Sequence, residues 1–198
     1  MGLSFFLIVI ILANVIVSRK GFKDPVFFNH YMLQVKPIQQ GQYYRLWSSS
    51  LLHVDSSHLL FNMMTLYFFG DYVVSYFGGV YFWLIYLISV TSGSLFGVAF
   101  NSEEPNYTAV GASGGVIGVL FSAILTYPQM QLGLLFIPIP IPGYLFVALY
   151  IAYTLYGMKR KNDSIGHSAH LGGAVGGLLL SWFLEPNLIS NWMEQLPF

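Results

Sequence analysis

The chain has 198 residues, no cysteine, and eight basic side chains balanced by eight acidic ones. Charged residues make up 8% of the sequence and hydrophobic residues 56%, whereas a soluble domain carries roughly 25% charged residues to wet its surface. This excludes an ordinary soluble domain. Zero net charge removes the electrostatic case for nucleic acid, and the absence of cysteine excludes disulfides and thiolate chemistry. We expect one membrane-embedded domain, residues 1–198.

Long apolar stretches, continuous rather than alternating, divide the chain. A helix needs about 20 mostly apolar residues to span a bilayer, and about 17 make a short span. Lipid admits only helices or closed barrels, and the continuous pattern favours helix. The sequence therefore predicts an all-α, polytopic bundle with six transmembrane helices, at residues 2–17, 57–77, 80–100, 111–127, 143–157 and 165–184. Pro138, Pro140 and Pro142 exclude regular helix just before the fifth of them.

The connector between the first two predicted spans, residues 18–56, is long for a membrane loop. It mixes charged residues with seven aromatic ones: Phe22, Phe27, Phe28, Tyr31, Tyr43, Tyr44 and Trp47. Aromatic rings prefer the boundary between membrane and water. We therefore predict that this connector lies in the interface, with an ordinary hydrated loop as the alternative.

Polar residues at membrane depth are costly and by default mark function. His58 and Asn62 are four residues apart, so they share one face of the second predicted helix. Ser113 lies in a Gly-Ala-Ser-Gly-Gly string that opens the fourth helix, where free backbone N–H groups would stabilise a developing negative charge. Each feature alone has a structural alternative, since His and Asn bond neighbouring helices and glycine allows close helix packing.

The sixth predicted helix places a histidine among small residues. The residues that share a face with His170 are Gly166, Ala169, Gly173 and Gly177. A partner helix can therefore come close to His170, although a buried histidine bonded to a carbonyl is the alternative. A serine hydroxyl needs a base to take its proton, and histidine is the usual base. Acyl transfer needs a nucleophile, a base and donors for the oxyanion. These three helices offer one serine, one histidine and a His/Asn donor pair.

At this point the chain resembles the rhomboid family of intramembrane serine proteases, over about residues 3–184. The motifs that carry the resemblance are His58-x-x-x-Asn62, Gly111-x-Ser113-Gly114 and Ala169-His170-x-x-Gly173, in this order. The family also has an interfacial loop after its first helix, which fits residues 18–56. Its frequent Trp-Arg pair in that loop is matched by Tyr44-Arg45.

The resemblance implies roles for individual residues. Ser113 would be the nucleophile, and His170 the base of a dyad without a carboxylate. His58, Asn62 and the backbone N–H of Ser113 would form the oxyanion hole. We expect no cofactor and no metal, because His167 with His170 is an incomplete set of ligands.

Two departures from the family pattern lead to further expectations. Many members have an aromatic residue four positions after the serine, stacked on the base, whereas this chain has Ile117, so we expect aliphatic packing around His170. Many members also have a glutamate where this chain has Val74, which would leave Arg45 without its family partner. We interpret His53 and His167 as structural residues.

The resemblance implies an endopeptidase that cuts transmembrane segments of membrane proteins and functions as a monomer in the lipid bilayer. A pseudoprotease that binds membrane clients without cutting them is the alternative, and a transporter with a histidine proton relay is a third possibility. We expect a bacterial cytoplasmic (inner) membrane location with the active site open to the extracytoplasmic side. The positive-inside rule opposes this orientation, because both basic clusters would lie on the same side as the site.

Overall fold

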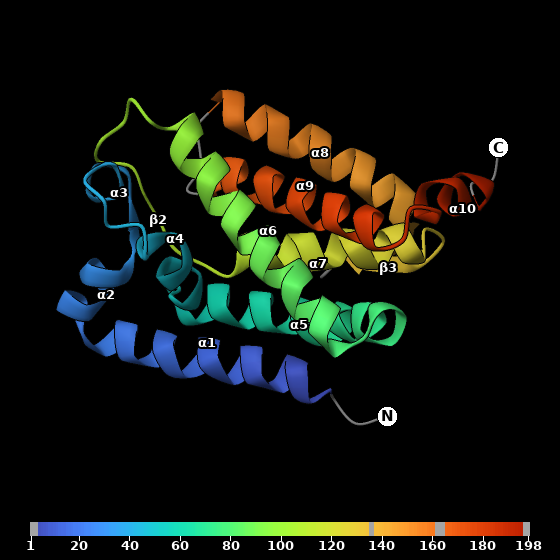
Figure 1. Ribbon diagram of the computed structural model, residues 1–198, viewed down its shortest axis with the longest axis horizontal. Coiled ribbons are helices and arrows are strands. Elements are labelled where there is room, and N and C mark those ends of the chain that lie inside the picture. Colours follow the sequence, from blue (N-terminus) through green and yellow to red (C-terminus); the bar gives the residue numbers. More distant parts are fainter. Residues whose placement is uncertain (1–3, 135–136, 161–164, 196–198) are drawn as a thin grey trace.

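Long helices form the body of the structure and short elements cover its two ends (Figure 1). The computed structural model describes residues 4–134, 137–160 and 165–195. The long helices in this part of the chain are α1 (Phe5–Lys23), α5 (Ser56–Phe77), α6 (Gly79–Phe100), α7 (Ser113–Thr126), α8 (Gly143–Arg160) and α9 (His167–Leu184). Each overlaps one predicted span, so the mostly helical fold agrees with the sequence analysis.

The boundaries of α1 differ most from the prediction. The helix continues six residues beyond the predicted end at residue 17, as far as Lys23. Basic side chains end the apolar run, but they do not end a helix. Pro25 does so, because its ring disfavours helical geometry in the residue before it. The Asp24 side chain accepts a hydrogen bond from the N–H of Phe27 (2.9 Å) and begins α2 (Pro25–Tyr31).

By length and apolar composition alone, α1 and α6 are the two helices in the described ranges that could cross a membrane. Helix α7 is apolar but has only 14 residues. Helices α5, α8 and α9 carry polar, charged or glycine-rich stretches that lower their hydropathy. The six-span topology therefore stays a prediction.

The distribution of polarity is that of a protein in lipid. Large apolar side chains point outward from the long helices, among them Leu12, Ile16, Phe68, Leu84, Leu87, Leu95, Leu149 and Leu179. Small polar residues are fully buried instead, including Asn14, Ser18, Ser89, Ser122 and Ser181. Contacts of this kind, with small and hydroxylated residues between helices, are typical of membrane bundles.

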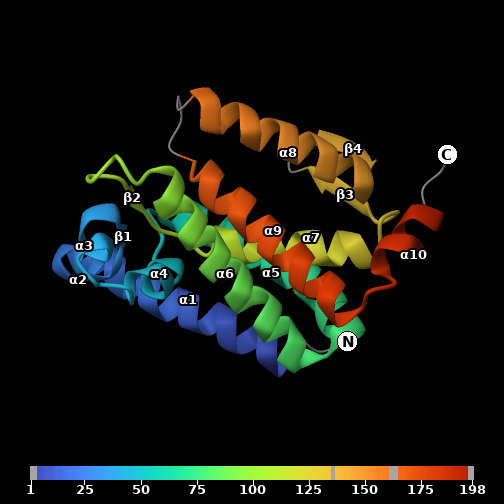
Figure 2. The same cartoon turned by 45° about the horizontal axis from the view of Figure 1, so that its top comes forward.

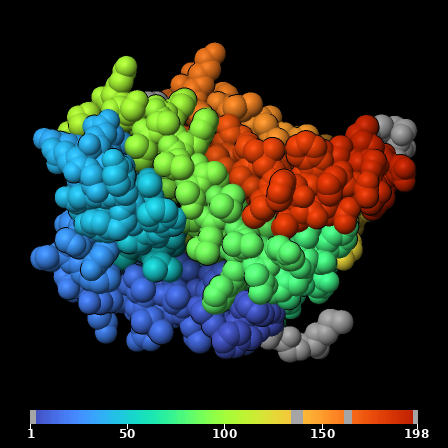
Figure 3. Space-filling view, in the orientation of Figure 1, coloured from blue at the N-terminus to red at the C-terminus, as the bar shows by residue number. Residues whose placement is uncertain are grey.

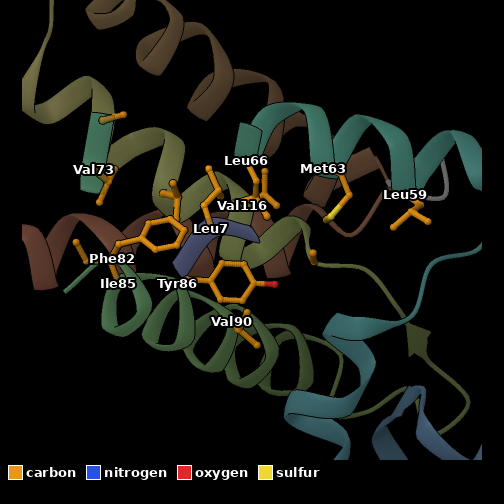
Figure 4. Close-up of a cluster of buried hydrophobic side chains, with 13 residues drawn as sticks. Leu7, Leu59, Met63, Leu66, Val73, Phe82, Ile85, Tyr86, Val90 and Val116 are labelled. Atoms are coloured by element: carbon orange, nitrogen blue, oxygen red, sulfur yellow. The ribbon is translucent and has the colours of Figure 1, made fainter. Parts of the chain in front are cut away.

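Helix α7 is the central element, because it contacts α5, α6, α8 and α9. Helices α1, α5, α6 and α7 meet in an apolar core, where Leu7, Leu66, Phe82 and Val116, one from each helix, are all buried (Figure 4). The core fixes α7 against α5 and α6. Helix α7 also contacts α9.

Glycines bring α9 into backbone contact with its neighbours. A Cβ added to Gly173 would overlap the carbonyl oxygen of Gly114, and one added to Gly177 would come 2.5 Å from the carbonyl oxygen of Gly118. On the α6 side, a Cβ on Gly93 would come 2.6 Å from the carbonyl oxygen of Ala169. Helix α9 is therefore held so close to α6 and α7 that no side chain larger than that of glycine fits at these contacts.

The predicted interfacial connector is folded into short elements at one end of the bundle (Figure 1). After α2 come β1 (Leu33–Gln34), α3 (Val35–Gln39), α4 (Arg45–Ser48) and the 3-10 helix η1 (Ser49–Leu51). Strand β1 pairs antiparallel with β2 (Thr108–Ala109), which immediately precedes the serine motif. Helix α4 packs on α6, where the Ser94 hydroxyl donates to the carbonyl of Leu46 (2.7 Å). The space-filling view shows this connector lying against α6 (Figure 3).

Arg45 holds the connector together without a carboxylate from position 74. Its side chain is buried and donates to the Gln42 side chain (2.8 Å) and to the carbonyls of Asn29 (3.0 Å) and Met32 (2.7 Å). As expected, Val74 leaves Arg45 without the glutamate of the family pattern, but Arg45 is not left without hydrogen bonds. Neutral oxygens close by in sequence accept its hydrogens instead.

The other end of the bundle carries a hairpin and the last helix (Figure 2). Strands β3 (Gln131–Leu134) and β4 (Ile137–Pro142) pair antiparallel, and α10 (Leu188–Glu194) follows α9. The proline-rich segment before α8 is not helical, as its sequence predicts. It forms a strand of a two-stranded sheet, where proline is tolerated because an edge strand leaves every second N–H unpaired.

The glycine contact predicts a large effect from the addition of one methyl group. Gly173→Ala should force α9 away from α7 and lower the free energy of unfolding by about 1–3 kcal/mol, the usual cost of overpacking. The measurement is thermal unfolding of the purified protein in detergent. Gly133→Ala is the matched control, because a Cβ there would meet nothing within 4 Å. Equal melting temperatures of the two variants would contradict the packing argument.

Candidate active site

Ser113 and His170 lie in direct contact. Ser113 is the first residue of α7 and His170 lies in the first turn of α9. The His170 Nε2 atom is 2.7 Å from the Ser113 hydroxyl oxygen, although 57 positions separate the two residues in the sequence. The glycine contact between α7 and α9 creates this proximity, which the motifs predicted.

The start of α5 presents the other two predicted residues. Asp55 caps the helix by accepting a hydrogen bond from the N–H of His58 (2.7 Å). The Asn62 side-chain amide donates one hydrogen to the carbonyl of His58 (2.9 Å), which leaves its second N–H free to bind another acceptor. The Nδ1 atom of His58 is buried and has no hydrogen-bond partner among the described residues.

All four residues line one cavity of about 760 Å³. Its walls come from α2, α5, α6, the β2 segment, α7 and the start of α9. Several wall residues are apolar, including Phe28, Val54, Phe61 and Val90. The cavity therefore combines an apolar wall with a few converging polar groups, which is the usual make-up of a binding site.

Gly111 leaves the room that the site needs. Its φ angle is +131°, a backbone conformation that side chains disfavour. A Cβ at this position would lie 2.9 Å from Nε2 of His58 and 3.6 Å from the Ser113 hydroxyl oxygen. The His58 ring edge and the serine therefore face the same small space, and glycine keeps this space open.

A tyrosine, which sequence reasoning missed, bonds the far side of the His170 ring. The Tyr150 hydroxyl of α8 lies 3.0 Å from the His170 Nδ1 atom, and the two rings are nearly parallel with centroids 6.5 Å apart. The expectation of purely aliphatic packing around His170 is therefore wrong. The family pattern places an aromatic residue on the helix of the serine. Nothing in the sequence pointed to α8 as its source.

His53 is fully buried beneath the loop that leads into α7. The Ser18 hydroxyl has one hydrogen and donates it to the carbonyl of Leu51 (2.8 Å), so its oxygen accepts from Nδ1 of His53 (2.8 Å). Nε2 of His53 then accepts the N–H of Ala112 (3.4 Å). A single neutral tautomer satisfies all these bonds. His53 thus ties α1 to the residue before Ser113, which supports the structural role expected for it.

Burial lowers the pKa of His53 to about 3, and the neighbouring His58 acts in the same direction. The two rings meet edge to face with centroids 4.9 Å apart. His53 therefore stays neutral, as its hydrogen bonds require. Among the described residues, no group of three or more metal-ligating side chains could hold a metal ion.

The geometry defines a class of protein: a helical bundle with an apolar exterior and a hydrogen-bonded Ser–His pair in an open cavity. Residues 40–187 match the family model of the Rhomboid domain. The chain belongs to the rhomboid family and is an integral membrane protein. The family assignment made from the three motifs is confirmed.

Three relatives illustrate the range of the family. The chain is 30% identical over 183 residues to RHOMBOID-like protein 12, mitochondrial, of Arabidopsis thaliana, and 32% identical over 140 residues to Rhomboid protease GluP of Bacillus subtilis. It is 25% identical over 179 residues to Rhomboid protease GlpG of Haemophilus influenzae. These matches cover 85%, 71% and 89% of the chain, and 54%, 26% and 87% of the respective relatives. The chain thus spans about half or less of the first two.

The low pKa of His53 predicts a dependence of stability on pH. Because this pKa is lower in the folded chain than the ordinary value of 6.5, the unfolded chain binds more protons between about pH 3 and 6.5. Stability should therefore fall as the pH drops through this window, by up to about 1.4 kcal/mol per pH unit from this group. His53→Gln should flatten the decline in melting temperature between about pH 7 and pH 5.

The matched control for this change is His30→Gln, at an exposed histidine of α2. The quantity to compare is the slope of melting temperature against pH. The melting temperature itself does not serve, because His53→Gln also loses hydrogen bonds and lowers stability at every pH. An unchanged slope in His53→Gln would show that His53 is not held neutral in the folded protein.

Proposed function

We propose that this chain is an intramembrane serine endopeptidase that cleaves transmembrane segments of membrane proteins through a Ser113–His170 dyad. The observation that carries the proposal is the 2.7 Å contact between the serine hydroxyl and His170 Nε2, at the wall of a cavity inside a membrane protein. Relatives named as rhomboid proteases support the same function.

In the first step, the Ser113 oxygen attacks the scissile carbonyl carbon while Nε2 of His170 takes the hydroxyl proton. The tetrahedral intermediate collapses when the C–N bond breaks, and the imidazolium of His170 gives its proton to the leaving amine. An acyl-enzyme on Ser113 remains. Water then attacks the ester with His170 again as the base, which releases the new carboxyl end and restores the serine.

The oxyanion of each intermediate would be held by the free N–H of Asn62, the His58 side chain and the backbone N–H of Ser113. The first N–H groups of a helix have no partner within the helix, so that of Ser113 is directed outward at the start of α7. The small space beside Gly111 is where the His58 ring edge and Ser113 meet. These donors are fixed before substrate binds, which is the source of their effect on rate.

Substrates of such a site are segments that leave lipid and expose a carbonyl, which a stable helix hides in its own hydrogen bonds. Helix breakers and small residues near a helix end meet this requirement. We propose six spans, α1, α5, α6, α7, α8 and α9, in a bacterial inner membrane, with the site open to the extracytoplasmic side and the chain active as a monomer. Mitochondrial relatives show that family members occupy other membranes as well.

The nucleophile is tested by Ser113→Ala. We expect cleavage of a single-span test substrate in liposomes to fall to background, because the change removes the attacking oxygen and nothing else. Labelling by a serine-directed fluorophosphonate should disappear as well. Ser190→Ala, an exposed serine of α10, is the control and should cut and label at the wild-type rate. A wild-type protein that binds the substrate but neither labels nor cuts would identify a pseudoprotease instead.

The oxyanion hole is tested by Asn62→Ala and His58→Ala. Loss of one preorganised donor typically costs about 10²–10³ in kcat, and KM should change far less because the donors act on charge that develops in the transition state. The readout is kcat and KM for the same test substrate, with melting temperature as the check on folding. Equal changes in kcat and KM, or loss of stability alone, would assign these residues to helix packing.

A further inference from the structure

We propose that Tyr150 is a positioning residue for the base: its hydroxyl oxygen accepts the Nδ1–H of His170, which leaves Nε2 free to take the Ser113 proton. This inference rests on the proposed function, because it concerns how the base is prepared. The His170 ring has two atoms that can form hydrogen bonds, Nδ1 and Nε2.

The His170 ring is bonded on both sides, by residues of two different helices. Nε2 is 2.7 Å from the hydroxyl oxygen of Ser113 on α7, and Nδ1 is 3.0 Å from the hydroxyl oxygen of Tyr150 on α8. A neutral imidazole carries one hydrogen, so one ring nitrogen donates and the other accepts. Only the tautomer with the hydrogen on Nδ1 lets Nε2 accept the serine proton. In that tautomer, Tyr150 is the acceptor of the Nδ1–H bond.

The Tyr150 ring is itself held in place. It meets the buried Phe121 of α7 edge to face at 5.6 Å and stacks on Phe146 of α8 at 5.6 Å. It also lies nearly parallel to the His170 ring. Three aromatic contacts fix the ring and with it the position of the hydroxyl oxygen, so the bond to Nδ1 does not depend on a freely rotating side chain.

Tyr150 does not line the site cavity. It reaches His170 from the side opposite Ser113, as its bond to the opposite ring nitrogen requires. Substrate in the cavity would therefore not touch it. A role through His170 predicts an effect on kcat and none on substrate binding, which separates positioning from a contribution to the cavity wall.

The hydroxyl takes the place that a carboxylate holds in a Ser-His-Asp triad, where the acid fixes the tautomer of the histidine. A carboxylate can only accept, whereas a phenol can also donate, so the tautomer of the His170 ring reports which role Tyr150 takes. A phenol is neutral, so it orients the ring without offsetting the charge that His170 gains during the reaction. Its loss should therefore cost much less than the ~10⁴-fold seen when a triad aspartate is replaced by its amide. About tenfold is the scale of one neutral hydrogen bond.

The test compares Tyr150→Phe with Tyr156→Phe. The first change removes the hydroxyl and keeps the ring with its aromatic contacts. The second removes an exposed hydroxyl from the same helix. We expect Tyr150→Phe to lower kcat about tenfold with KM unchanged, and the rate of fluorophosphonate labelling of Ser113 to fall in parallel. Tyr156→Phe should match the wild type in all three, and both variants should melt within a few degrees of it.

A second readout needs no turnover. Nitrogen-15 NMR of histidine-labelled protein, with the His170 signals assigned through a His170→Ala sample, distinguishes a ring nitrogen that carries hydrogen from one that does not. We expect hydrogen on Nδ1 in the wild type and a mixture of tautomers in Tyr150→Phe. Hydrogen on Nε2 of the wild-type ring would overturn the proposal without any variant.

The outcomes separate this inference from the proposed function. A wild type that cleaves the substrate together with a Tyr150→Phe variant of equal kcat would overturn the positioning role and leave the protease standing. A wild type with the Nδ1–H tautomer that neither cuts nor labels would support the placement of Tyr150 and refute the proposed function. Equal losses in both tyrosine variants would attribute the effect to α8 as a whole and overturn the role of the Tyr150 hydroxyl.

Discussion

Between α7 and α9, glycine meets glycine, and the two backbones approach more closely than any side chain would allow. The proximity of Ser113 and His170 follows from this approach. Ser113 and Gly114 are neighbours on α7, and His170 and Gly173 are one turn apart on α9, so the contact that joins the backbones also joins serine to histidine. In lipid, where apolar surface gives no net drive for helices to associate, close packing supplies much of the attraction. Stability and chemistry thus rest on the same few residues.

Around this contact, outer elements hold the polar residues of the site from behind. His53 connects Ser18 of α1 to the loop before Ser113. Tyr150 of α8 reaches the far nitrogen of His170. The bonds of His53 are buried away from competing water, where a satisfied polar network is rigid and an incomplete one is costly. The helices at the periphery of the bundle therefore contribute to the geometry of a site that they do not line.

The mostly helical fold and the proximity of Ser113 to His170 could be predicted because local patterns specify them. Apolar runs give helices, and a serine or histidine beside spaced glycines marks a surface where helices touch. The partners of Arg45 and His170 could not be predicted, because they depend on which helix lies beside which. Ile117 suggested an aliphatic environment for His170, yet the aromatic ring comes from Tyr150, 20 positions before the histidine in the chain. Spacing along one helix carries no information about a neighbour from another.

The order of the helices along the chain has a consequence for biosynthesis. The ribosome makes the nucleophile first, and all of α8 follows before His170, in the first turn of α9, exists. Helix α9 occupies the groove between α6 and α7, so the groove is complete before its occupant is made. A nascent chain that has inserted everything up to α8 has a serine with no base. The chemistry that we propose therefore starts only when α9 docks, and a molecule without α9 cannot attack its neighbours in the membrane.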